Sequence, residues 1–130
     1  MAHTKFHLGY FTKFGPTQWP CGSDEFGARW ADGSYHKELA KILEAAKFDF
    51  ILFEDTLVVG DKYGGSMELD LKNATLGPKL DPMPLLPVMA QETSHIGLIA
   101  TASTTFYPPF LLARLLSTID SLTRGRAGWN

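Results

Sequence analysis

Apolar residues follow two patterns that alternate along this chain. Runs of strand length alternate with stretches in which apolar residues recur at helical spacing. The strand-like runs are residues 5–12, 48–53 and 96–101, and the helical stretches are 35–47, about 84–94 and 110–122. The second run is apolar apart from Asp49 and the third is apolar up to Thr101, which is typical of strands buried on both faces of a parallel sheet. The pattern predicts parallel strands joined by helices.

The first helical stretch, residues 35–47, has a plausible start signal. Ser34 precedes it and is the expected N-cap. One face of this helix should point inward, and its expected residues are Leu39, Ile42, Leu43 and Ala46.

Prolines and a glycine set the limits of the two later helices. Pro84 and Pro87 can both lie near the start of a helix that runs to about Ser94, because proline fits the first helical turn. The residues expected to face inward on that helix are Leu85, Val88 and Met89. Pro108 and Pro109 should open the last helix, whose apolar stripe is Leu112, Leu115, Leu116, Ile119 and Leu122. Gly125 follows it, where a left-handed backbone would end a helix at little cost.

Two long segments interrupt this alternation. Residues 14–33 hold four glycines and two tryptophans, and residues 57–81 are rich in glycine and charge, so we expect loops with at most a little irregular helix. Long loops with aromatics often cover a functional site, although a packed surface loop is an equally good interpretation of residues 14–33.

The order of elements is β-α-β-loop-α-β-α-β, which predicts an α/β fold with right-handed crossovers. Residues 126–130 begin a fourth strand, so about three and a half βα units are present. They could form a small open sheet or part of a barrel, and a (β/α)8 barrel needs eight strands and about 250 residues. We expect residues 1–130 to be one domain, incomplete at the C-terminus, from the N-terminal part of a TIM barrel.

Composition limits the binding partners and the cellular compartment expected for this protein. A formal charge of −2 with scattered lysines and arginines gives no case for binding nucleic acid or an anionic membrane. No apolar run approaches the roughly 20 residues that span a bilayer. Cys21 is the only cysteine, which fits a reducing cytoplasm and excludes an internal disulfide.

Three motifs resemble those of the bacterial-luciferase-like flavin monooxygenases: KFDFILFEDTL (47–57), IGLIATASTTFYPPFLLAR (96–114) and STIDSLTRGRAGWN (117–130). The branch that they resemble contains nitrilotriacetate, EDTA, dibenzothiophene-sulfone and long-chain alkane monooxygenases. The resemblance implies a (β/α)8 barrel, much longer than this chain and often a homo-oligomer. It also implies a two-component monooxygenase, in which a separate NAD(P)H-dependent flavin reductase supplies reduced FMN, which uses O2 to oxidise a small organic substrate.

Candidate site residues lie where the strands end, because barrel active sites form at the carboxyl ends of the strands. The resemblance implies that Asp55 and Thr101 contact the flavin, and Asn130, in the fourth strand, could reach the edge of the isoalloxazine ring through its amide. Each also has a simpler interpretation: a carboxylate that caps a turn, a buried threonine bonded to a local carbonyl, and a frayed terminal residue. Ser103 and Thr104 are reserves for Thr101, because one residue of register decides which side chain faces inward.

Other candidates have weaker support. Glu54 should point away from Asp55 and be structural, and His7 could face a pocket but more simply lies on the surface. His3, His7, His36 and His95 have no metal-ligand spacing, so no metal is expected. Cys21 lacks an evident base that would make it a nucleophile. Trp19, Trp30 and Tyr63 could roof a pocket or pin loops to the body.

Two alternatives to a flavin monooxygenase stay open. The first is an oxidoreductase of the same superfamily that uses the deazaflavin F420 without oxygen chemistry. The second is a non-enzymatic half-barrel module that pairs through an open strand edge. The sequence names neither the substrate nor any catalytic residue, and an isolated 130-residue chain is expected to have little or no activity.

Overall fold

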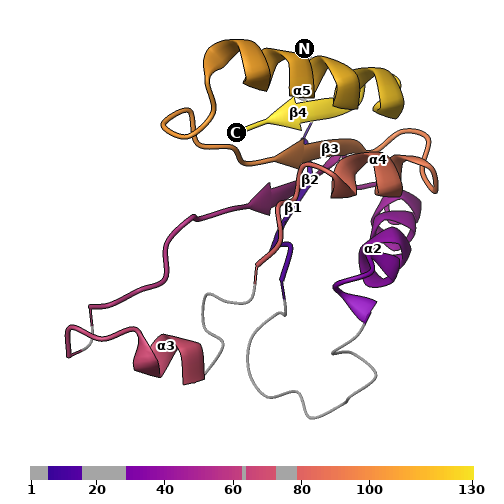
Figure 1. Cartoon of the computed structure of the whole chain (residues 1–130). Helices are drawn as coiled ribbons and strands as arrows, with labels where there is room; N and C mark the ends of the chain where they lie inside the picture. Colours follow the sequence, from indigo (N-terminus) through magenta and orange to yellow (C-terminus); the bar gives the residue numbers. More distant parts are fainter. Residues whose placement is uncertain (1–5, 16–28, 63, 73–78) are drawn as a thin grey trace.

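The fold is a parallel sheet with helices packed on it, as seen in a computed structural model that describes residues 6–15, 29–62, 64–72 and 79–130 (Figure 1). The sheet has four strands in the order β1-β2-β3-β4, and every neighbouring pair is parallel. The strands are β1 (Gly9–Lys13), β2 (Phe50–Glu54), β3 (Gly97–Ala100) and β4 (Ala127–Trp129). The predicted order of elements along the chain and the parallel direction of the strands are confirmed, with each strand a residue or more shorter than the segment predicted for it.

The helices of the described residues are α2 (Ser34–Ala45), α3 (Glu68–Lys72), α4 (Leu85–Ala90) and α5 (Pro109–Thr123). The core lies between the sheet and α2, α4 and α5, with α4 contacting both of the other two helices. Alternate strand side chains fill this core and are fully buried: Ile51, Phe53, Leu98 and Ala100. The opposite face is more open, and Phe11 on it is 66% exposed.

The start of α2 differs from the prediction. Ser34 is the first helical residue rather than the N-cap, which is Gly33 in a left-handed conformation with φ 77°. The Ser34 N–H donates to Asp32 Oδ1 at 2.8 Å, so an aspartate before the helix satisfies a donor of the first turn. The Ser34 prediction is wrong because glycine adopts this backbone at lower cost.

The inward face of α2 also differs from the prediction. The buried residues are His36, Ala40 and Leu43, whereas Ile42 is 58% exposed and Ala46 is exposed. The ring of His36 packs edge-on against Phe14 and lies 5.7 Å from the ring of Phe53. This aromatic packing turns the helix so that a histidine, rather than Ile42, faces the sheet.

The later helices follow the prediction more closely. α4 ends at Ala90, short of Ser94, and buries Leu85 and Met89 as expected. α5 begins with Pro109 in its first turn. Its stripe is buried at Leu112 and Ile119, but Leu122 is 61% exposed.

The end of α5 confirms the role of Gly125. Arg124 and Gly125 both have positive φ, and the Gly125 N–H donates to Asp120 O at 2.9 Å. Gly125 therefore closes α5 in the left-handed conformation that was predicted. In the long segment after β2, α3 is the only described helix, and it lies away from the sheet (Figure 1).

Two charged side chains tie together the edge of the sheet where the strands begin. The Glu44 carboxylate accepts hydrogen bonds from three successive backbone N–H groups, those of Ser94, His95 and Ile96, at 2.7 to 3.1 Å. Arg126 donates to the carbonyls of Ala90, Thr93, Ile96 and Thr123 and to Thr93 Oγ1. The loop between α4 and β3 is therefore fixed from both sides, by α2 and by the start of β4.

Candidate functional site

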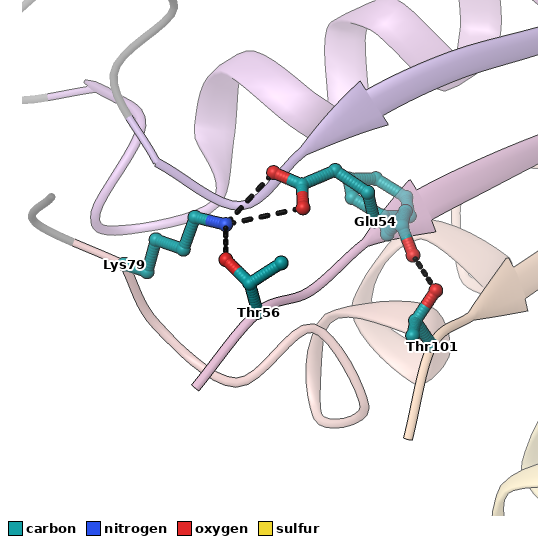
Figure 2. A network of polar contacts seen from close by, with 5 residues as sticks. Glu54, Thr56, Lys79 and Thr101 are labelled. Atoms are coloured by element: carbon teal, nitrogen blue, oxygen red, sulfur yellow. Dashed lines mark hydrogen bonds and ion pairs between the residues drawn. The ribbon is translucent and has the colours of Figure 1, made fainter. Parts of the chain in front are cut away.

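Thr101 and Asn130 meet at the carboxyl edge of the sheet. The Thr101 hydroxyl donates to Phe53 O at 2.8 Å (Figure 2). The Thr101 N–H donates to the same oxygen at 3.0 Å. Asn130 Nδ2 donates in turn to Thr101 Oγ1 at 3.1 Å. These bonds form a directed chain across β4, β3 and β2, and they show that the structure brings together two of the three predicted residues.

The backbone of Asn130 is paired with its neighbouring strand. Its N–H donates to Ala100 O at 3.1 Å, and its carbonyl accepts from the Ala102 N–H at 3.1 Å. Trp129 Nε1 also donates to Ala102 O at 3.1 Å. Asn130 therefore continues the hydrogen-bond ladder of β3 and β4.

Asp55 follows β2 at the same edge, in a strongly acidic setting. Partial burial raises the pKa of its carboxyl, and Asp81 and Glu54 add to that change, whereas Lys79 and the backbone N–H of Thr56 oppose it. Burial, the charge and hydrogen bond of Asp81, and the charge of Asp55 raise the pKa of the Tyr107 phenol. The Tyr107 hydroxyl donates to Asp81 Oδ2 at 3.1 Å.

The side on which Asp55 lies is not fixed by strand alternation. Phe53 and Ala100 are register partners, and both face the helices. The residues that follow them, Glu54 and Thr101, therefore face the open side of the sheet. Asp55 comes after the last paired residue of β2. Among the contacts of the described residues, none joins Asp55 directly to Thr101 or Asn130, although all three lie at the carboxyl ends of adjacent parallel strands.

Lys79 is a residue of this edge that the sequence did not single out. Its Nζ donates to Glu54 at 2.9 Å (Oε1) and 3.1 Å (Oε2), and to Thr56 Oγ1 at 2.7 Å (Figure 2). The Lys79 side chain is 11% exposed and the Glu54 side chain 24%, so this ion pair is largely withdrawn from water. Glu54 thus has the structural role expected of it, with a partner 25 residues away.

The reserve residues take part in a local turn. Ser103 O accepts the N–H groups of Phe106 and Tyr107 at 3.1 and 3.2 Å, and Ser103 Oγ lies 3.4 Å from the Thr105 nitrogen. Thr104 is exposed. The bonds of Thr101 make it, rather than Ser103 or Thr104, the residue of this run that joins the strands.

In the described part of the chain, no hydrogen bond or ion pair joins a histidine to this edge. His7 is 65% exposed and pairs with Asp49 at 3.2 Å where the strands begin, which confirms its surface role. His36 is buried without a hydrogen-bond partner for either ring nitrogen. Burial lowers the pKa of His36, and the nearby backbone of Lys13 acts in the opposite direction. That backbone group does not meet the geometry of a hydrogen bond to either ring nitrogen. Within the described ranges, no three His, Cys, Asp or Glu side chains gather as metal ligands.

The aromatic candidates divide between described and undescribed parts of the chain. Trp30 packs edge-on against Phe14 at 6.1 Å, so it pins its segment to the body of the fold. His3, Trp19, Cys21 and Tyr63 lie outside the described residues. No helix in the described part of the chain is long and apolar enough to cross a membrane.

Parallel strands, crossover helices and polar residues at the carboxyl edge are the features of a section of a (β/α) barrel enzyme. The sequence model of the luciferase-like monooxygenases matches residues 6–130. The chain therefore belongs to the luciferase-like monooxygenase family, as the three motifs indicated.

Curated relatives agree with this assignment. The chain is 44% identical over 103 residues to the dimethyl-sulfide monooxygenase of Hyphomicrobium sulfonivorans, a match that covers 79% of this chain and 22% of that protein. It is 39% identical over 99 residues to the dibenzothiophene-sulfone monooxygenase of Rhodococcus erythropolis, covering 75% and 22%. The chain thus spans about a fifth of the length of these relatives.

Solved structures support the barrel assignment. DmoA from Hyphomicrobium sulfonivorans superposes with a TM-score of 0.87 and 37% identity, over 98% of this chain and 28% of that one. The riboflavin lyase RcaE, solved with a modified FMN and its substrate riboflavin, gives a TM-score of 0.83 and 26% identity, over 98% and 29%. The chain has the fold of one section of a luciferase-like TIM barrel, which confirms the predicted fold class.

Proposed function

We propose that this chain is the part of an FMN-dependent monooxygenase that contacts the flavin ring. The enzyme would use reduced flavin and O2 to oxidise a small organic substrate. The observation that carries the proposal is that Asp55, Thr101 and Asn130 end three successive parallel strands, in a chain of the luciferase-like family. The names of the relatives support oxygen chemistry, and the modified FMN of the riboflavin lyase supports the cofactor.

The side chains at this edge suit the rim of a flavin ring. The ring carries N–H donors and carbonyl acceptors, and an ionised Asp55 can only accept. Thr101 already donates its hydrogen to Phe53 O, so it too offers an acceptor. Asn130 keeps a second amide N–H and a carbonyl oxygen, so it can meet either kind of group. This set fits a heteroaromatic ring better than a metal or a phosphate.

The flavin supplies the redox chemistry when it is bound, whereas the protein binds, orients and shields it. Asp55 would hold a ring N–H, and the bonds linking Asn130, Thr101 and Phe53 would fix the neighbouring edge of the ring. The groups that bind the flavin phosphate and the catalytic residues remain unassigned, because barrels often hold the phosphate by loops after strands seven and eight.

The wider proposal concerns the whole protein. A separate NAD(P)H-dependent reductase would deliver reduced FMN, the assembly would be a homo-oligomer, and both would work in the cytoplasm. Residues 1–130 would form one luciferase-like domain. Relatives act on different sulfur compounds, so family membership does not choose the substrate.

The direct test is anaerobic titration of the protein, expressed from its full reading frame, with reduced FMN. Asp55→Ala removes a charge-assisted acceptor, and we expect binding to weaken by about tenfold or more. Asp61→Ala is the matched control, because Asp61 is an exposed acid of the same loop and should leave affinity unchanged.

Two results would contradict the proposal. One is no binding of reduced FMN, and the other is equal binding by wild type and Asp55→Ala. Oxygen consumption coupled to a flavin reductase separates a monooxygenase from an F420-dependent oxidoreductase, and binding of any flavin separates both from a purely structural module.

A further inference from the structure

We propose that Arg126 is a positioning residue, which holds β4 in register with β3 and so sets where the amide of Asn130 lies. This inference rests on the function proposed above and adds a residue to it. It starts from the place of Arg126 in the chain, between the left-handed end of α5 and the first residue of β4. Asn130, which donates to Thr101, comes directly after the last residue of that strand.

The N–H donors of the Arg126 guanidinium are all engaged. A guanidinium has five such donors. Those of Arg126 bond at 2.9 to 3.1 Å to Thr123 O, Thr93 Oγ1, Thr93 O, Ile96 O and Ala90 O. These acceptors belong to the ends of α5 and α4, the loop after α4 and the residue before β3. Because all of them are uncharged oxygens, the forked shape of the guanidinium matters more here than its charge.

The backbone of Arg126 begins the pairing of β3 with β4. Its carbonyl accepts from the Leu98 N–H at 2.9 Å, while its guanidinium binds Ile96 O, two residues earlier on the neighbouring chain segment. Arg126 therefore holds β3 through both its main chain and its side chain. Since β4 has only three residues, Ala127–Trp129, its far end at Asn130 lies close to this fixed point.

The register of β4 leaves little room for a shift. Gly128 is paired with Ile99, and a Cβ at Gly128 would lie 2.6 Å from Ile99 Cγ1. A slip by one residue would bring Ala127 or Trp129 opposite Ile99, where a side chain does not fit. The observed register therefore fixes where Asn130 leaves the strand.

The flavin edge depends on this placement. The Asn130 side chain is exposed and donates to Thr101 Oγ1 at 3.1 Å. A hydrogen bond weakens steeply once its angle leaves a narrow range, so a small displacement of β4 is enough to lose this one. Loosening the contacts of Arg126 should therefore weaken flavin binding through Asn130.

Thr93→Val is the milder test of these contacts. It removes one acceptor of Arg126, together with the bond from Thr93 Oγ1 to Met89 O. In the protein from its full reading frame, we expect the affinity for reduced FMN to fall by about twofold to threefold. Thr118→Val is the matched control, because Thr118 is exposed on α5 and its hydroxyl likewise bonds to a carbonyl four residues earlier, that of Arg114. It should leave affinity unchanged.

Arg126→Lys is the stronger variant. Lysine keeps the positive charge but has its donors on a single nitrogen, so it cannot span acceptors on four parts of the chain. We expect affinity for reduced FMN to fall by about fivefold or more, so that charge alone does not restore binding. Wild-type affinity in Thr93→Val would overturn the inference, whether or not Arg126→Lys folds.

Asn130→Ala separates positioning from general loss of stability. If Arg126 acts through Asn130, Thr93→Val should weaken binding in the wild-type background and have no further effect in Asn130→Ala, because coupled groups are not additive. A purely structural role would weaken binding by the same factor in both backgrounds, and that result would overturn the inference. Wild-type affinity in Asn130→Ala would also overturn it, because Asn130 would then have no part in binding.

Hydrogen exchange without flavin follows the position of β4 directly. The amides of Ala102 and Asn130 form the last hydrogen bonds between the segments of β3 and β4, and they should exchange about fivefold faster in Thr93→Val. The Asp49 amide, which bonds to the residue before β1, should be unchanged. Faster exchange at all three amides would indicate a general loss of stability and would contradict the inference.

The two measurements together distinguish this inference from the proposed function. Faster exchange confined to the Ala102 and Asn130 amides, with weaker flavin binding, supports both proposals. The same exchange in a protein that never binds reduced FMN supports the role of Arg126 in placing β4 but refutes the flavin role. Unchanged exchange in a protein that does bind flavin refutes only the role of Arg126.

Discussion

At the scale of single residues, the direction of each hydrogen bond decides what the edge of the sheet can offer a ligand. Thr101 gives its only hydroxyl hydrogen to Phe53 O and receives one from Asn130. It is thereby held in one rotamer and can serve a ligand only as an acceptor. The carboxylate of Asp55 has the same polarity, so this edge should favour a ring N–H over a ring carbonyl.

Thr101→Val tests this polarity at a single atom. Valine keeps the branched shape but loses both side-chain bonds, so we expect reduced-FMN binding to weaken about fivefold to tenfold and stability to fall by about 1 kcal/mol. Thr101→Ser, the matched control, keeps the hydroxyl and should stay near wild type. Affinity and thermal unfolding measure the two effects, and wild-type affinity in Thr101→Val would show that the hydroxyl makes no contact with the ring.

At the scale of elements, α2 is joined to the loop before β3 by one carboxylate. Desolvation acts to raise the pKa of Glu44, but the N–H groups of Ile96, His95 and Ser94 together lower it. A lowered pKa in the folded state means that the ionised form stabilises the fold. That stability is present above the unfolded-state pKa of about 4.5 and is lost as the pH falls through the folded-state value.

Glu44→Gln should therefore cost stability in a pH-dependent way. At pH 7 we expect a loss of about 1 kcal/mol, because a neutral amide accepts these N–H groups less strongly and solvent screens the site. The difference from wild type should shrink below about pH 4. Glu38 lies on the same helix as Glu44 and forms a surface ion pair with Arg29. Glu38→Gln removes that pair and should change the stability little. Denaturant unfolding at several pH values would measure this, and a pH-independent difference would contradict it.

At the scale of the whole molecule, the sheet has one face covered by helices and one that is more open. Phe11 on the open face is 66% exposed, and Leu52 and Ile99 beside it in the register are half-buried. The outer strands β1 and β4 each pair on one side only within the described sheet. Such surfaces favour association with another protein surface.

The isolated 130-residue chain should accordingly self-associate and show no turnover. Phe11→Lys should weaken this association several-fold, because it places a charge in the apolar face. Phe110→Lys is the control, since Phe110 is 75% exposed on α5 rather than on the sheet. Sedimentation at several concentrations would measure the effect. Equal effects of the two substitutions would show that the open face is not the surface involved.

Much of this fold could be predicted from local pattern. The apolar runs located three of the four strands, and a glycine and a proline marked the limits of α5, because each acts through its own backbone. The inward face of α2 could not be predicted in this way. Its two overlapping stripes, one with Ile42 and one with His36, both have helical spacing. Packing of the His36 ring against Phe14 and Phe53 decided between them.

The candidate site divides in the same manner. By itself, the sequence determined that Asp55, Thr101 and Asn130 stand at strand ends, because apolar runs and their polar ends are local features of the chain. Only the tertiary structure decided that Asn130 donates to Thr101, that Lys79 reaches Glu54 and Thr56, and that Asp55 lies among acids. The physical reason is that these contacts join groups 23 to 29 residues apart, and their distances depend on how the strands pair and where the loops return.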